Sequence, residues 1–247
     1  MNSAGLDVGS RTVALVLYDG GVVDSTVVDT GIRPLERCRQ LLAGKSYRRL
    51  VVTGYGRHLV APALGGDLVS EIGAYARGAG HLYPDCGTVI DIGGQDSKAI
   101  ALDESSRVTK FEMNDRCAAG TGRFLEVMAA TLELEIGELG GFALTASGSV
   151  TINSLCTVFA ESEVVSLIAR GEEASAIAQA LHQAVATRVA VMVRRVGLKE
   201  RVVFAGGAAR NGCLKRLLGD KLGVDITVPG QPQLVGALGA ALMAGNP

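Results

Sequence analysis

A pattern of three strands and two turns occurs twice in the chain, and this repeat limits the possible folds more than any other feature. The strands of the first copy cover residues 4–8, 13–18 and 22–29, and those of the second cover 88–92, 97–102 and 107–113. One offset of 84 positions relates three pairs of residues: Asp7 and Asp91, Gly9 and Gly93, and Asp19 and Asp103. Three pairs in one register indicate duplicated β-hairpin units, and therefore a chain with two similarly built halves.

The composition is that of a globular protein with room for one large or two modest domains. The chain has 247 residues, of which 48% are hydrophobic and 20% are charged. Its 24 basic and 25 acidic residues leave a formal net charge of −1, so no nucleic-acid partner is expected. The first residues lack the features of a signal peptide, and no apolar run reaches the roughly 18 residues of a membrane span. These two observations predict a cytoplasmic protein without a membrane segment.

Helices and further strands surround the two copies. Apolar spacing predicts helices over 34–44, 68–80, 122–134, 158–169, 173–196, 211–222 and 233–244, and strands over 49–53, 201–205 and 224–228. Residues 54–57 are expected to form a loop, and the glycine-rich segment 137–148 is expected to be mostly loop and turn. His182 lies beside the apolar stripe of the helix 173–196, where a surface or boundary position is expected.

Five cysteines lie far apart in the sequence: Cys38, Cys86, Cys117, Cys156 and Cys213. An odd number at wide spacings does not indicate a disulfide framework, so buried thiols and metal ligands are the options. Cys38 is expected in the core, and Cys86 and Cys213 are expected as packing residues or surface thiols. Cys117 and Cys156 each stand just before a predicted helix, where free N–H groups and the helix dipole stabilise a thiolate. Two thiolates are half of the ligand set of a usual iron–sulfur cluster, and a two-fold dimer would double them.

Three glycine-rich turns follow strands: after Asp7, after Asp91 and after Phe204. Glycine lets backbone N–H groups approach phosphate oxygens, and the two aspartates are suited to hold Mg²⁺ directly or through water. Each turn by itself also fits an ordinary tight hairpin, whereas the set of three favours a nucleotide site. The sequence has no P-loop, no dinucleotide fingerprint, and no H-E-x-x-H, C-x-x-C or G-x-S-x-G motif.

The order of these motifs resembles that of the actin–hexokinase–heat-shock-chaperone superfamily. Residues 5–10, 90–96 and 204–211 are similar to its two phosphate motifs and its adenosine motif. The resemblance implies an α/β fold of two duplicated actin-like ATPase (ribonuclease H-like) lobes, each a mixed sheet with flanking helices, with ATP or ADP in the cleft between them. The expected first lobe is 1–84 plus 231–247, and the expected second lobe is 85–230, with the cluster cysteines and the adenosine motif.

Within this superfamily, the chain resembles the ATP-dependent activators of 2-hydroxyacyl-CoA dehydratases, in the family that also holds the ATPase subunits of benzoyl-CoA reductase. The similar segments are 53–57, 91–96, 114–124, 156–164 and 236–241. The resemblance implies that Cys117 and Cys156 bind one [4Fe–4S] cluster that is shared across a homodimer. The alternative is a pair of buried thiols at helix starts.

The resemblance also assigns a nucleotide site. The Mg²⁺–phosphate cradle would be formed by Asp7, Gly9, Ser10, Asp91, Gly93 and Gly94, with the two aspartates as Mg²⁺ ligands, and the adenosine side by Gly206, Gly207 and Asn211. From its place after the second turn, Gln95 is expected to orient the attacking water. Ala14 departs from the pattern, because many relatives have lysine there. Arg11 could supply the missing charge, or it could be a solvated surface residue.

The implied function is ATP-driven electron transfer. One low-potential electron would come from ferredoxin or flavodoxin and pass to an iron–sulfur dehydratase or reductase that acts on an acyl-CoA. ATP binding and hydrolysis would change the angle between the lobes and between the helices that meet at the cluster. Two alternatives stay open: a small-molecule kinase on the same scaffold, which would tolerate loss of both cysteines, and a nucleotide-sensing module that binds ATP without turnover.

Overall fold

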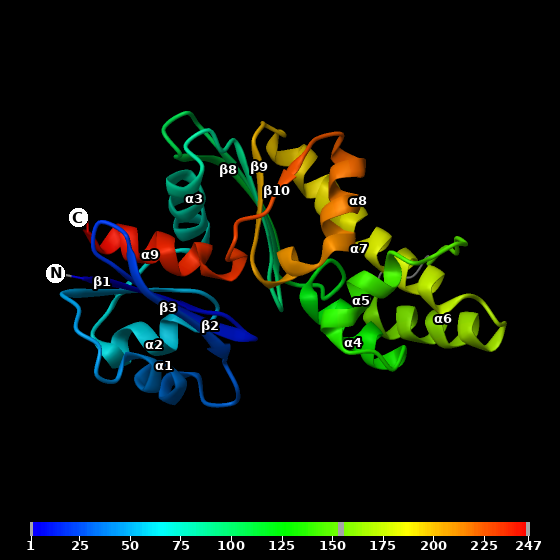
Figure 1. Ribbon diagram of the computed structural model, residues 1–247, viewed down its shortest axis with the longest axis horizontal. Helices are drawn as coiled ribbons and strands as arrows, with labels where there is room; N and C mark the ends of the chain where they lie inside the picture. The colour runs from blue at the N-terminus through cyan, green and yellow to red at the C-terminus, as the bar shows by residue number, and fades with distance from the viewer. Residues whose placement is uncertain (1, 153–155, 246–247) are drawn as a thin grey trace.

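The computed structural model describes residues 2–152 and 156–245, and its two halves lie side by side along the long axis of the molecule (Figure 1). Each half is built on a five-stranded mixed sheet with helices packed against it. Residues 153–155, which come directly before Cys156, lie outside the described residues.

The two sheets have the same topology. The first contains β1 (Ser3–Val8), β2 (Thr12–Tyr18), β3 (Val22–Asp29), β4 (Arg49–Thr53) and β5 (Asp67–Leu68), in the order β3-β2-β1-β4-β5. The second contains β6 (Thr88–Ile92), β7 (Ser97–Leu102), β8 (Val108–Asn114), β9 (Val202–Ala205) and β10 (Ile226–Thr227), in the order β8-β7-β6-β9-β10. In both sheets the three hairpin strands are antiparallel, and the next strand pairs in parallel with the first. The duplication predicted from the repeat is confirmed.

The first turns of the two hairpins are closed by equivalent hydrogen bonds. The N–H of Gly9 donates to the carbonyl of Thr12 at 2.9 Å, and the N–H of Gly93 donates to the carbonyl of Asp96 at 2.9 Å. Both donors and both acceptors are 84 positions apart. The offset found in the sequence is therefore also a structural equivalence between residues.

Helices cover the sheets and connect them. They are α1 (Pro34–Leu42), α2 (Arg57–Leu64), α3 (Glu71–Leu82), α4 (Gly122–Thr131), α5 (Ile136–Ala143), α6 (Thr157–Ala169), α7 (Ala174–Val196), α8 (Gly212–Leu222) and α9 (Val235–Gly245), with short 3-10 turns η1 (Gly207–Arg210) and η2 (Pro232–Leu234). α1 and α2 pack on the first sheet, and α4, α5, α7 and α8 form the main core of the second half.

Two helices cross each other between the sheets (Figure 1). α9 packs on β1, β2 and β4 of the first sheet, whereas α3 packs on α9 and on the strands of the second sheet. The end of the chain thus returns to the first half. The lobe limits 1–84 plus 231–247, and 85–230, stay a prediction.

α7 is the central helix of the second half. Among the described residues it is the helix that is long and apolar enough to cross a membrane, but 67% of its apolar window is buried inside the molecule. It packs on α5, α8 and β7, and its apolar stripe belongs to the largest core cluster. Its hydropathy is therefore explained by burial within this lobe.

Two helices differ from the sequence-based prediction. α5 lies in the segment 137–148, which was expected to be mostly loop, and this expectation is wrong. Its glycines weaken the helical pattern, but Glu135 and Glu138 form a capping box at its start and Leu139 is fully buried. α2 was not predicted, and its first residue, Arg57, belongs to the segment 54–57 that was expected to be a loop.

Candidate functional site

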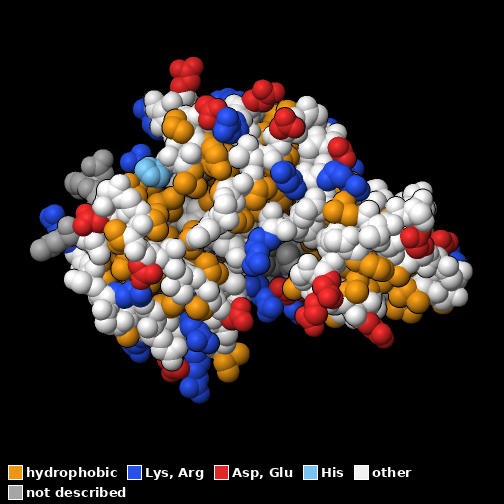
Figure 2. Space-filling model, viewed as in Figure 1, with side chains coloured by type: hydrophobic (Ala, Val, Ile, Leu, Met, Phe, Trp, Pro, Cys, Tyr) orange, Lys and Arg blue, Asp and Glu red, His pale blue; other side chains and the backbone are white. Residues whose placement is uncertain are grey.

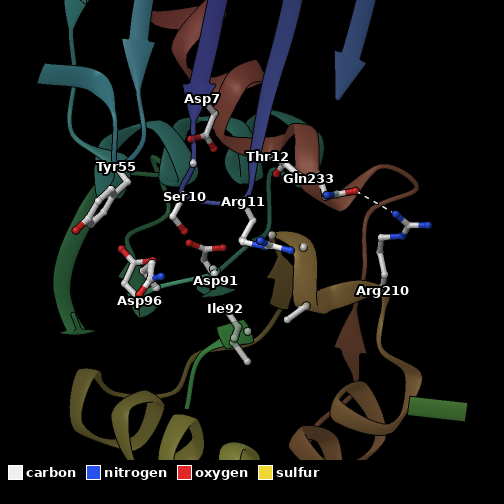
Figure 3. A pocket seen from close by; sticks show the side chains of 18 of the residues that line it. Asp7, Ser10, Arg11, Thr12, Tyr55, Asp91, Ile92, Asp96, Arg210 and Gln233 are labelled. Atoms are coloured by element: carbon white, nitrogen blue, oxygen red, sulfur yellow. Dashed lines mark hydrogen bonds between the residues drawn. The ribbon is translucent and has the colours of Figure 1, made fainter. Parts of the chain in front are cut away.

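A cavity of about 440 Å³ lies between the two lobes, with Asp7 and Asp91 facing it from opposite sides (Figure 3). The space-filling view shows the molecule hollowed between its halves, with basic side chains gathered near the opening (Figure 2). Every residue predicted for the nucleotide lines this cavity: Asp7, Gly9, Ser10, Arg11, Asp91, Gly93, Gly94, Gln95, Gly206, Gly207 and Asn211. The fold thus brings three turns from distant parts of the sequence to one place.

Asp7 and Asp91 hold equivalent positions on β1 and β6, and a glycine from the neighbouring parallel strand faces each of them. Gly54 follows β4 with φ +92°, and Gly206 follows β9 with φ +81°. A β-carbon on Gly54 would lie 2.5 Å from Oδ1 of Asp7, and one on Gly206 would lie 2.1 Å from Oδ1 of Asp91. Glycine is required at both places, because of the backbone conformation and because of the adjacent carboxylate.

The two carboxyl groups are buried, and their pKa values are raised. Burial first, and then the charges of Glu71 and Asp91, raise the pKa of Asp7 to about 7. Burial raises the pKa of Asp91 to about 6, although Lys98 opposes this change. Oδ2 of Asp91 accepts from Lys98 at 3.0 Å, whereas its Oδ1 has no hydrogen-bond partner in the described part of the chain. A buried carboxylate oxygen without a donor is suited to bind a cation.

Lys98 belongs to this site but was missed in the sequence interpretation. Its side chain is 1% exposed, and Nζ lies 3.0 Å from Asp91, 2.8 Å from Asp96 and 2.8 Å from Glu71. Burial disfavours the charge of Lys98, but these three carboxylates outweigh burial and raise its pKa. The repeat contained the clue, since Ala14 and Lys98 are 84 positions apart and each faces the aspartate of its hairpin. The residue of the second hairpin that is equivalent to Ala14 is therefore Lys98.

Glu71, at the start of α3, joins the two lobes around this lysine. One oxygen of Glu71 lies 2.8 Å from Nζ of Lys98, and the other accepts from Nη1 of Arg57 at 2.9 Å. Nη1 of Arg57 also donates to the carbonyl of Gly54 at 2.9 Å. A chain of buried and partly buried charges therefore runs from α2 to β7, along the side of the cavity that holds the aspartates.

On the side predicted for adenosine, a buried histidine holds Asn211. Oδ1 of Asn211 caps α8 by accepting from the N–H of Leu214 at 3.0 Å, and its Nδ2 lies 2.9 Å from Nε2 of His182. Nδ1 of His182 lies 2.7 Å from the carbonyl of Ala178, so the network assigns the proton to Nδ1 and leaves Nε2 as the acceptor. The surface or boundary position expected for His182 is wrong: α5 and α8 cover it completely, and burial lowers its pKa.

The loop that carries Cys117 follows β8 and is fixed by side chains. Nδ2 of Asn114 donates to the carbonyl of Cys117 at 2.9 Å and to that of Ala119 at 3.0 Å. Oγ1 of the buried Thr121 donates to the carbonyl of Ala118 at 2.7 Å. The position of the Cys117 backbone is therefore determined by the end of β8 and the start of α4.

The first turn of α4 is bonded directly to the second glycine turn. The N–H of Gly122 donates to the carbonyl of Gly93 at 2.8 Å, and the N–H of Arg123 donates to the carbonyl of Gly94 at 2.9 Å. A shift of this glycine turn would consequently be transmitted to α4 and to the loop of Cys117.

The five cysteines form two groups. Cys38, Cys86 and Cys213 are buried, whereas Cys117 is partly exposed and Cys156, at the start of α6, is exposed. Neither Cys117 nor Cys156 lines the nucleotide cavity. In the part of the chain that the structure describes, no three His, Cys, Asp or Glu side chains gather into a metal site. Two accessible thiols per chain fit a four-sulfur ligand set only if two chains supply it.

Arg11 reaches from the first turn to α4 of the second half, and its side chain is 60% exposed. Its Nε lies 2.7 Å from Oε1 of Glu126 on α4, and Arg11 points into the cavity (Figure 3). Nη1 of Arg123 lies 3.3 Å from the other oxygen of Glu126. Arg11 is thus the charged side chain that the first turn contributes to the cavity.

Comparisons with known proteins agree with this geometry. Residues 4–244 match the BadF/BadG/BcrA/BcrD ATPase family. The chain is 42% identical to the 2-hydroxyisocaproyl-CoA dehydratase activator of Clostridioides difficile, over 99% of this chain and 95% of the activator. It is 40% identical to the (R)-2-hydroxyglutaryl-CoA dehydratase activating ATPase of Acidaminococcus fermentans, over 97% and 95% of the two chains.

A solved structure shows the same architecture. The activator of 2-hydroxyisocaproyl-CoA dehydratase from Clostridium difficile, with bound ADPNP, superposes with a TM-score of 0.90 at 42% identity, over 99% of this chain and 94% of the activator. The fold is therefore that of duplicated actin-like ATPase lobes, each a mixed sheet with flanking helices, as the sequence predicted. The match of residues 4–244 to the family, the identity with the two activators and the shared fold lead to one conclusion: the chain belongs to the BadF/BadG/BcrA/BcrD ATPase family.

Proposed function

We propose that this protein is an ATP-hydrolysing activator, which delivers a low-potential electron to an iron–sulfur dehydratase or reductase that acts on an acyl-CoA. The relatives named above are activators of 2-hydroxyacyl-CoA dehydratases, which supports such a dehydratase as the partner. The relative with bound ADPNP supports ATP as the nucleotide. The proposed electron donor is ferredoxin or flavodoxin, and the proposed location is the cytoplasm.

The observation that carries this proposal is the connection between the cavity and a partly exposed cysteine. The carbonyls of Gly93 and Gly94 accept from the first N–H groups of α4, and the loop of Cys117 leads directly into that helix. A kinase that only phosphorylates a small acceptor has no need for an accessible thiol loop bonded to its phosphate turn. An ATPase that controls a redox centre does need such a connection.

In the nucleotide site, each proposed role follows from the position of the residue. Asp7 and Asp91 would hold Mg²⁺, and the unpaired Oδ1 of Asp91 fits this task. The glycine turns would bind the phosphates through backbone N–H groups, with Gly9, Ser10 and Arg11 from the first lobe and Gly93 and Gly94 from the second. Gln95 lines the cavity beside this turn and would orient the attacking water, while Gly206, Gly207 and Asn211 would bind adenosine.

Cys117 and Cys156 of each chain would supply four thiolates in a homodimer, which is the ligand set of one [4Fe–4S] cluster. When bound, such a cluster supplies a centre for one-electron transfer. The surface of α6 next to Cys156 supports a dimer, because four apolar side chains are exposed on it: Val158, Phe159, Val165 and Ile168. Burying such a surface against a second copy would stabilise the dimer.

The test is anaerobic purification with analysis of iron, sulfide and molecular mass. The proposal expects about four iron atoms per dimer. Cys117→Ser and Cys156→Ser should each lose most of the iron, whereas the matched control Cys213→Ser, at a buried cysteine, should keep it. Full iron content in either of the first two variants would overturn the assignment of the ligands. ATP hydrolysis that requires a small acceptor and survives loss of both cysteines would favour the kinase instead.

A further inference from the structure

Arg11 connects the first phosphate turn with α4 across the cavity. Nε of Arg11 lies 2.7 Å from Oε1 of Glu126, and both side chains line the cavity. The arginine comes from the first lobe and the glutamate from the second. A β-carbon on Gly94 would lie 2.6 Å from Cγ of Arg11, so the arginine stem passes directly over the second phosphate turn.

Arg11 is also the cation that is available to the phosphates. The basic residues that line the cavity, among those that the structure describes, are Arg11, Lys98 and Arg210. Lys98 is buried and already contacts three carboxylates, and Arg210 bonds to Gln233 at 3.4 Å on the adenosine side. The first lobe has Ala14 at the place equivalent to Lys98, so its turn depends on Arg11 for positive charge.

The two partners of this ion pair differ in mobility. The side chain of Arg11 is 60% exposed, and that of Glu126 is 17% exposed. Glu126 lies within α4 and is also paired with Arg123, so its position is set by the helix. Arg11 extends from a turn and can exchange partners by rotation of its side chain, without movement of the backbone.

We propose that Arg11 is a nucleotide-responsive switch, which pairs with Glu126 in the nucleotide-free protein and transfers to the phosphates of bound ATP. The inference rests on the proposed function and deepens it. α4 begins five residues after Cys117, and its first turn is bonded to Gly93 and Gly94. Transfer of Arg11 would release the ion pair between the first turn and α4. At the same time the nucleotide would engage the glycine turn that is bonded to the start of the same helix.

Charge and geometry favour the transfer. A triphosphate has more negative charge than one carboxylate, and its oxygens suit the planar fork of a guanidinium group. The Arg11–Glu126 pair, by contrast, is partly exposed and of modest strength. In the proposed exchange Arg11 leaves Glu126 to bind phosphate, so Glu126 competes with the nucleotide for Arg11.

The test is a double-mutant cycle on nucleotide affinity, measured by isothermal titration calorimetry of the anaerobic holoprotein with a non-hydrolysable ATP analogue and Mg²⁺. Glu126→Gln should bind the analogue about two- to fivefold more tightly than the parent, which corresponds to the strength of a partly exposed ion pair. Arg11→Gln should bind at least about tenfold more weakly, because a charged contact with phosphate is lost. In the Arg11→Gln background, Glu126→Gln should no longer increase the affinity.

Arg123→Gln is the matched control, because it removes the other arginine on the same carboxylate. It should not increase the affinity, since Arg123 is not a side chain that lines the cavity. An equal increase in Arg123→Gln, or an increase by Glu126→Gln that persists without Arg11, would overturn the exchange of partners. Arg11→Lys keeps the charge and should recover part of the affinity that Arg11→Gln loses.

The outcome separates this inference from the proposed function. Suppose that the parent binds the analogue and that Cys117→Ser loses the iron, but that Glu126→Gln has the same affinity as the parent. The switch is then refuted, and the proposed function as an activator stands. If the parent binds no nucleotide, the proposed function fails, and the switch fails with it.

Discussion

The Asp7→Asn substitution is expected to stabilise the nucleotide-free protein at pH 8, and to have a smaller effect at pH 5. Folding buries Asp7, and burial together with the charges of Glu71 and Asp91 raises its pKa from the ordinary 3.8 to about 7. A carboxyl group with a raised pKa binds its proton more tightly in the folded chain. Its contribution to the free energy of unfolding therefore falls as the pH rises from about 4 to about 7. Asparagine has nearly the same shape and no charge to bury.

The size of the effect follows from the two pKa values. At pH 8, Asp7 is ionised in the folded and the unfolded chain, and the difference between 3.8 and about 7 corresponds to about 4 kcal/mol at about 1.4 kcal/mol per pH unit. At pH 5 the folded chain keeps the proton and the unfolded chain has mostly lost it, which leaves about 2 kcal/mol. The advantage of asparagine should thus grow by about 2 to 3 kcal/mol between pH 5 and pH 8.

Urea denaturation of parent and variant at pH 5, 6, 7 and 8, without nucleotide or Mg²⁺, measures this difference. Asp24→Asn is a control of opposite sign: its hydrogen bond with Lys45 lowers the pKa of Asp24, so this variant should lose stability at pH 8. An advantage of Asp7→Asn that does not change with pH, or that shrinks as the pH rises, would refute the raised pKa of Asp7.

Three further substitutions test the site. Lys98→Met leaves Asp91 and its neighbours without their cation and should lower the free energy of unfolding by about 3 to 5 kcal/mol at pH 8 in the same urea assay; an unchanged value would contradict the buried ion cluster. Gly206→Ala would place a methyl group 2.1 Å from Oδ1 of Asp91 and should weaken ATP-analogue binding at least roughly tenfold by calorimetry, more than Gly207→Ala, where the nearest atom is 3.8 Å away. Asn211→Ala removes the cap of α8 and should cost about 1 kcal/mol, measured by thermal unfolding; full stability would show that the cap is dispensable.

The sequence alone determined the duplicated architecture. Strand periodicity and turn glycines are local properties, and the offset of 84 positions aligned them in two copies. The register of the hairpins then fixed which residues are equivalent, and the position of Asp7 and Asp91 at the strand ends followed from it. Ala14 lies seven residues after Asp7, and Lys98 lies seven residues after Asp91. The same comparison would therefore have identified Lys98 as the residue equivalent to Ala14.

Other parts of the site depend on contacts that no local pattern contains. α5 was obscured because its glycines lower the helical signal; one of them, Gly140, makes room for Asn211, since a β-carbon there would lie 2.6 Å from Oδ1 of Asn211. His182 was placed at the surface because helix periodicity describes one stripe, whereas α5 and α8 cover a second side of α7.

The charge pattern of the cleft was decided by the tertiary structure. Glu71 on α3 meets Lys98 on β7, and Arg11 from the turn after β1 meets Glu126 on α4, and only tertiary packing brings each pair within 3 Å. Burial then changes what these groups do: away from water, a carboxylate must find a cation or keep its proton. The sequence by itself determined where the glycine-rich turns and the cysteines lie along the chain. The tertiary structure determined which charges meet between the lobes and how the second turn is bonded to the helix after Cys117, because these contacts join residues that are far apart in the sequence.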